Sequence, residues 1–103
     1  MESRLLDRAT LLQEIEAIFE GASGNFPSPG IVLNDVETVV QAGRQGEVQP
    51  AAERVIALLS LDLEPLRKAA LLSLMVRLTG KRKFDPVANY VLEKRAAYVT
   101  SQG

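Results

Sequence analysis

The sequence predicts an all-α protein: a compact orthogonal or irregular bundle of about five helices, forming a single helical domain over residues 1–103. In five separate segments, apolar residues recur at steps of three and four, which is the spacing of one face of an amphipathic helix. No run alternates apolar and polar residues over five or six positions, and no Asn-Gly or Asp-Gly hairpin turn occurs, so strands are not expected. A chain of 103 residues, 47% of them hydrophobic, has the ordinary size and composition of one globular domain.

The first predicted helix runs from about Ser3 to Glu20, and Gly21 is its stop signal. A flexible loop is expected near 22–30, because two prolines and two glycines fall within residues 23–30. The apolar residues of this helix share one face: Leu5, Ala9, Leu12, Ile15, Ile18 and Phe19.

The start of the second helix has two possible positions. Ser28 can serve as the N-cap with Pro29 at the first helical position, or the helix begins at Asn34, where Glu37 completes a capping box. Either start places a stripe of valines on one side. The helix is expected to end near Gly43 or Gly46.

The third and fourth helices are joined by a very short link. The third is expected over Pro50–Leu59, and Asp62 is a good N-cap for a fourth helix over 63–79. From Ala69 to Leu78 this fourth segment is apolar nearly all round, which is typical of a helix buried on most sides. We therefore expect the helix 63–79 to be central in the bundle, either fully enclosed or with one apolar face exposed as an interface.

The fifth helix is predicted to open at Asp85, with Asp85 as the N-cap and Pro86 at the first helical position. Its tail, residues 100–103, is expected to fray. The apolar stripe of this helix comprises Ala88, Val91, Leu92, Ala96 and Val99.

Charge is divided unevenly along the chain. Residues 1–51 carry eight acids and three bases (−5), and residues 52–103 carry five acids and nine bases (+4), which together give the net charge of −1. Either the two halves attract each other within the folded monomer, or the basic half meets an acidic partner or another copy. The near-neutral total argues against bulk attraction to nucleic acid or to an anionic membrane.

The composition excludes most common catalytic sites. The chain has no Cys, His or Trp, which removes disulfides, thiolate nucleophiles, zinc fingers and every triad built on His. The Gly21–Asn25 segment lacks the Gly-Lys-Ser/Thr of a P-loop, and the carboxylates of Asp7, Glu14, Glu16 and Glu20 are interpreted as a solvated acidic face. We therefore expect a non-enzymatic protein with no catalytic, cofactor-binding or metal-binding residue.

Neither targeting nor a membrane span is expected from the sequence. The N-terminus, MESRLLDRATLLQE, is charged and is followed by no apolar region of a signal peptide. The longest apolar run, Ala69–Val76 with one serine, is far shorter than the roughly 20 residues that a membrane helix needs. These features predict a cytoplasmic protein that does not contact a membrane.

The favoured function is binding of another protein chain, as an adaptor, assembly factor, chaperone-like protein or anti-activator, or as a homodimer. This prediction rests on the surplus of apolar surface in the fourth helix. Phe26, in the predicted loop, either anchors a partner or folds back onto the core. The candidate partner-binding residues are Phe26, Met75, Val76, Leu78, Tyr90 and Tyr98.

The alternative function is a small nucleic-acid-binding regulator that uses the basic C-terminal half. Its densest cluster lies where the fourth helix ends, so the same charges can simply stabilise the helix C-terminus. Few aromatic residues accompany them, which gives little support to stacking on single strands. The candidate contacts to phosphate or to an acidic partner are Arg77, Lys81, Arg82, Lys83, Lys94 and Arg95.

Overall fold

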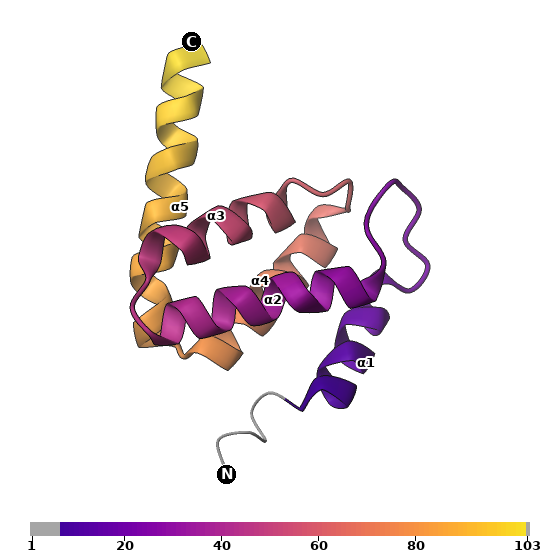
Figure 1. Ribbon diagram of the computed structural model, residues 1–103. Helices are drawn as coiled ribbons and strands as arrows, with labels where there is room; N and C mark the ends of the chain where they lie inside the picture. Colours follow the sequence, from indigo (N-terminus) through magenta and orange to yellow (C-terminus); the bar gives the residue numbers. More distant parts are fainter. Residues whose placement is uncertain (1–6, 103) are drawn as a thin grey trace.

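Five α-helices, and no strand, make up the part of the chain that the structure describes (Figure 1). The computed structural model describes the backbone of residues 7–102 and the side chains up to residue 95. The predicted all-α bundle of five helices is confirmed. The helices are α1 (Arg8–Phe19), α2 (Pro29–Arg44), α3 (Val48–Leu59), α4 (Pro65–Thr79) and α5 (Lys81–Gln102).

Helix α2 is the most deeply buried element and packs against all four other helices. Figure 1 shows it crossing the middle of the molecule, in front of α4. Its close approach to α4 is visible at Gly43, where an added Cβ would lie 2.8 Å from the methyl carbon of Thr79. The buried residues of α2 form one stripe: Val32, Leu33, Val36, Val39, Val40, Ala42 and Gly43.

The helix 63–79, predicted to be central, corresponds to α4 and is less enclosed than α2. Helix α4 does contact every other helix, but only Leu71, Leu74, Met75 and Thr79 of its 15 residues are buried. Its apolar composition extends to the side that faces solvent, whereas the valines of α2 all face neighbouring helices. An apolar composition therefore does not by itself give the position of a helix in this bundle.

Two of the predicted helix starts can be checked directly. Helix α2 begins at Pro29 with Ser28 at the N-cap position, which confirms the first of the two alternatives. Helix α4 has Glu64, not Asp62, at its N-cap position. The Asp62 carboxylate is used elsewhere, since it accepts a hydrogen bond from the backbone N–H of Asn25 at 3.3 Å and so fastens the loop between α1 and α2.

The predicted start of α5 at Asp85 is wrong, because the helix begins four residues earlier, at Lys81. Phe84, Val87 and Val91 are all buried, their spacing of three and four places them on one face of the helix, and the Phe84 N–H donates to the Gly80 carbonyl within its first turn. Pro86 thus lies inside the helix, where the carbonyl of Arg82 loses its usual N–H partner. Burial of the Phe84 ring outweighs this loss.

The loop predicted near 22–30 occupies residues 20–28, and Phe26 folds back from it onto the core. The rings of Phe26 and Phe19 meet edge to face, with 4.9 Å between their centroids. At the N-terminus, Asp7 caps α1, and the predicted residues 3–6 of this helix lie outside the described part.

At the other end of the chain, α5 extends to Gln102. The expected frayed tail, 100–103, concerns residues whose side chains lie outside the described part. Among the described residues, no helix combines the length and the apolar character that crossing a bilayer requires.

Candidate functional site

The outward-facing side of α4 is an exposed apolar surface. We call it the outer α4 face and define it by the exposed residues Leu66, Ala69, Ala70 and Ser73. Their spacing places them on one side of the helix. Leu66 is 85% exposed, more than the other exposed large hydrophobic residues, Ile31 and Leu92, at 53% and 65%.

This face exists because α4 is apolar on two sides and only one of them meets the core. Leu71, Leu74 and Met75 are buried against the rest of the bundle, and α2 packs on that inner side. Leu72 and Val76 are half-buried and border the outer α4 face. Of the two alternatives left open by the sequence, the structure shows the one in which an apolar face of this helix stays exposed.

A shallow groove separates α4 from α1. It encloses about 390 Å³ and is lined by small and apolar residues together with one ion pair. The pair joins Arg77 Nη2 to a carboxylate oxygen of Glu14 at 2.5 Å. The groove therefore widens the outer α4 face toward α1, and its other lining residues are Ala17, Ile18, Ala70, Ser73 and Leu74.

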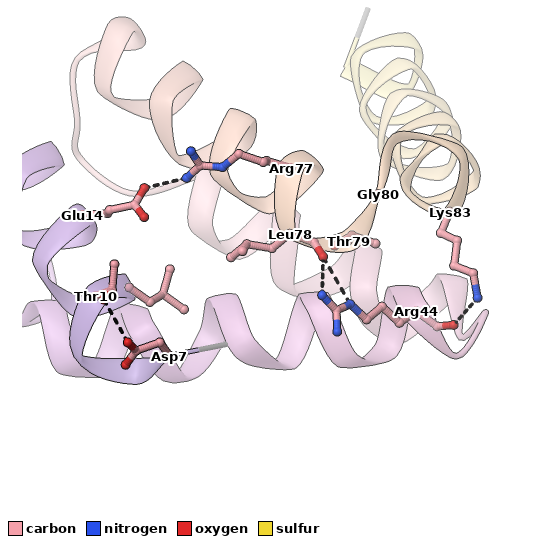
Figure 2. Close-up of a pocket in the computed structure, with 10 residues that line it drawn as sticks. Asp7, Thr10, Glu14, Arg44, Arg77, Leu78, Thr79, Gly80 and Lys83 are labelled. Carbon is pink, nitrogen blue, oxygen red and sulfur yellow. Dashed lines mark hydrogen bonds and ion pairs between the residues drawn. The ribbon is translucent and has the colours of Figure 1, made fainter. Parts of the chain in front are cut away.

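A second, larger hollow of about 670 Å³ lies where α1 begins and where α2 and α4 end (Figure 2). Glu14 and Arg77 line this hollow as well as the groove, so their ion pair stands between the two. Asp7 and Thr10 face it from α1, and the Asp7 carboxylate accepts hydrogen bonds from the Ala9 N–H and the Thr10 hydroxyl. The carboxylates of Asp7 and Glu14 are thus both engaged in contacts within the protein.

The cations at the larger hollow cap the ends of helices. Arg44, the last residue of α2, donates from Nε and Nη2 to the Leu78 carbonyl of α4 at 3.2 and 2.7 Å. Lys83 Nζ in turn donates to the Arg44 carbonyl at 2.8 Å, as Figure 2 shows. The last carbonyls of a helix have no hydrogen-bond donor within the helix, so both contacts supply donors to carbonyls that would otherwise lack one.

Arg67 plays the same role at the end of α1. Its Nη1 donates to the carbonyls of Ile18 and Glu20 at 2.6 and 2.8 Å, and its Nε contacts Glu64 at 2.9 Å. We refer to Arg44, Arg67 and Lys83 as the capping cations. This role could not be predicted from the sequence, because each cation caps a helix that is distant in the sequence.

The candidate partner-binding residues are not brought together. Met75 was wrongly expected to be available to a partner, since its side chain is fully buried under α4. Val76 borders the outer α4 face, whereas Leu78 is half-buried in the larger hollow and Phe26 is packed on Phe19. Tyr90 is half-buried with Lys94 Nζ 5.4 Å from its ring, and the Tyr98 side chain lies outside the described residues.

Of the candidate phosphate contacts, Arg77 and Lys83 line the larger hollow together, and the others lie elsewhere. Arg77 pairs with Glu14, and Lys83 caps α2. Lys81 lies 3.9 Å from Asp85. Arg82 and Arg95, for which no contact is named above, are exposed on α5.

The two oppositely charged halves of the chain are joined in the folded protein. Arg77 on α4 pairs with Glu14 on α1, and Arg54 on α3 pairs with Asp35 on α2 at 3.1 Å. Both ion pairs connect the basic half to the acidic half. This arrangement supports the interpretation that the uneven charge serves the monomer.

The acidic residues of α1 form no metal site in the described residues, where no group of three or more carboxylates is close enough to hold an ion. Glu16 and Glu20 are exposed, as expected of a solvated acidic face. Comparisons with protein-family models, curated proteins and solved structures found no match. The geometry of the chain is therefore the guide to its function.

Proposed function

We propose that this protein is a non-enzymatic helical module that binds another protein chain through the outer α4 face. The observation that carries the proposal is Leu66, a large apolar side chain left 85% exposed at the start of a helix whose neighbouring surface residues are Ala69 and Ala70. Removing such surface from water is the main driving force of protein association.

The shape of the surface supports a helical partner. Ala70 and Ser73 have short side chains, so the backbone of a second helix can come close to α4. Leu66 offers one projecting side chain beside them, and the groove toward α1 provides depth along the same face. An amphipathic helix laid on such a surface contacts it with residues spaced by three and four.

The contacts of the basic residues favour this function over nucleic-acid binding. Arg67, Arg77 and Lys83 each hold a protein group, either a helix carbonyl or a carboxylate. Arg44, Arg77 and Lys83 line the larger hollow together, but a phosphate backbone would have to compete with the protein groups that these donors already hold. Salt-dependent binding of a random duplex would be evidence for the alternative.

Site-specific photo-cross-linking tests the proposal. A photoreactive amino acid replaces Leu66 or Ser73 in the full chain, and a matched control carries it at Gln49, an exposed residue of α3. In cells of the source organism, we expect a discrete covalent adduct from positions 66 and 73 but not from position 49. If positions 66 and 73 give only the background seen at position 49, the proposal is wrong.

A further inference from the structure

The order of charges along α4 points to the identity of the partner. Near the N-terminal end of the helix, the acids Glu20, Asp62 and Glu64 are exposed. The middle of the outer α4 face, from Leu66 to Ser73, carries no charge of its own. Beyond its C-terminal end, Arg77, Lys81 and Arg82 are exposed. Arg77 pairs with Glu14 and Lys81 lies 3.9 Å from Asp85, so the excess positive charge at this end comes from Arg82, which has no ion pair among the described residues.

Two cations near the acidic end do not reverse this order. The guanidinium of Arg67 is held by the Ile18 and Glu20 carbonyls and by Glu64, and its side chain is only 23% exposed. Lys68 is half-buried and lies two residues after Leu66, hence on another side of the helix. Because Arg67 offsets Glu64, the excess negative charge at this end comes from Glu20 and Asp62. The surroundings of the outer α4 face are therefore acidic at one end and basic at the other, and the face itself is apolar.

We propose that the partner is a second copy of this chain, with α4 packed antiparallel on the partner's α4 across a twofold axis. This inference rests on the proposed function and specifies its partner. Reversing the direction of α4 places the acidic end of one copy against the basic end of the other, at both ends of the contact. The same antiparallel arrangement sets the two helix dipoles in their favourable orientation.

The small residues fix where the axis passes. With the axis between Ala70 and Ser73, the short side chains meet at the crossing point, where the two helices can approach to about 8–10 Å. Leu66 then reaches the partner's Val76 and the aliphatic stem of the partner's Arg77. Such a contact covers the most exposed large side chain of the face, on each copy, with apolar atoms.

The molecule as a whole is suited to this contact. Its Cα extents are 44 × 34 × 18 Å, so it is two helix layers thick, and α4 lies in the layer behind α2 (Figure 1). The outer α4 face points away from α2, and a face-to-face contact can continue onto α1 and the start of α5. A net charge of −1 produces little repulsion between copies, and twofold symmetry is the commonest arrangement of identical chains.

Sedimentation of the full chain from low to high micromolar concentration is the first test. We expect a monomer–dimer equilibrium in which Leu66→Lys raises the dissociation constant by about tenfold or more, because it removes the apolar contact and places a second positive charge against the partner's Arg77. The matched control is Leu92→Lys, which changes another exposed leucine, 65% exposed on α5, and should leave the equilibrium unchanged. Circular dichroism of both variants checks that the fold is retained.

Single-cysteine cross-linking tests the orientation, because the chain has no cysteine of its own. Ser73→Cys lies close to the proposed axis and should form a disulfide-linked dimer on mild oxidation, whereas Leu92→Cys should not. Leu66→Cys should not pair with itself, since antiparallel packing separates the two copies of residue 66 by roughly 16 Å along the helix. It should instead pair with Arg77→Cys when the two variants are mixed.

The outcomes separate this inference from the function on which it rests. A chain that stays monomeric at high micromolar concentration, with Ser73→Cys no more cross-linked than Leu92→Cys, overturns the second-copy inference. Self-pairing of both Ser73→Cys and Leu66→Cys would also overturn it, because that result indicates parallel helices. In either case, a photo-adduct at position 66 with the mass of a different protein would leave the proposed function standing.

Discussion

At the scale of single residues, Thr79 is the most instructive position in the core. It is 5% exposed, and its hydroxyl oxygen has no hydrogen-bond partner, which is unusual for a buried polar group. Its methyl group packs on Gly43, where α2 and α4 come close together. The residue therefore contributes packing but leaves a polar atom unsatisfied.

Replacing the hydroxyl by a methyl group should stabilise the protein. We expect Thr79→Val to raise the free energy of unfolding by about 1 kcal/mol, since the shape is kept and the unsatisfied polar atom is removed. Chemical denaturation measures the change. Thr38→Val is the control, because the Thr38 hydroxyl is exposed and donates to the Asn34 carbonyl at 3.0 Å. A loss of stability in Thr79→Val would mean that the hydroxyl has a partner in solution.

Two arginines allow a capping contact to be compared with a surface ion pair. Arg44 donates two hydrogen bonds to the Leu78 carbonyl in a half-buried setting, whereas Arg54 pairs with Asp35 and is 53% exposed. Arg44→Ala should lower the free energy of unfolding by about 1.5–3 kcal/mol, the range for hydrogen bonds from charged donors. Arg54→Ala should lower it by about 0–1 kcal/mol. Equal effects of the two substitutions on the denaturation midpoint would contradict the capping role.

At the scale of the helices, a single residue connects α4 to α5. Gly80 has φ 98° and ψ 130°, a conformation that residues with a Cβ rarely adopt. Its N–H donates to the Val76 carbonyl, and its own carbonyl accepts from the Phe84 N–H. The same residue thus closes one helix and opens the next.

Gly80→Ala should therefore destabilise the protein by about 1–3 kcal/mol through backbone strain alone. A Cβ at this position would meet no atom within 4 Å, so steric overlap plays no part. Gly30→Ala is the matched control, because its Cβ would also meet nothing within 4 Å and its φ is ordinary. Thermal unfolding should show a lower midpoint for the first variant and an unchanged or higher midpoint for the second.

The starts of α2 and α5 show which helix boundaries could be predicted from the sequence. Pro29 after Ser28 is a local start signal, and it marks the true start of α2. Asp85-Pro86 carries an equally good local signal, but it lies inside α5. The deciding factor there is the burial of Phe84, which depends on how α5 packs against the other helices and so is not encoded in the neighbouring residues.

At the scale of the whole molecule, the sequence predicted the fold class but not the surface that is left exposed. An apolar residue count in α4 cannot distinguish Met75, which is fully buried, from Leu66, which is 85% exposed. Placing the residues of α4 on a helical wheel separates these two sides, but only the packing of α2 and α1 shows which side is covered. The capping cations were missed for the same reason, since their acceptors are carbonyls of other helices.

Salt should act differently on the fold and on the proposed dimer. The ion pairs Arg77–Glu14 and Arg54–Asp35 involve partly exposed side chains, so screening them should change the free energy of unfolding by less than about 1 kcal/mol. In the antiparallel dimer, by contrast, the acidic and basic ends of α4 meet twice, and both contacts weaken as salt rises. We expect the dissociation constant from sedimentation to rise several-fold between low and high salt, while the melting temperature of the monomeric Leu66→Lys variant stays nearly constant. A dimer that salt leaves unchanged or strengthens would be held by the apolar centre of the face alone, and its helices would not need to be antiparallel.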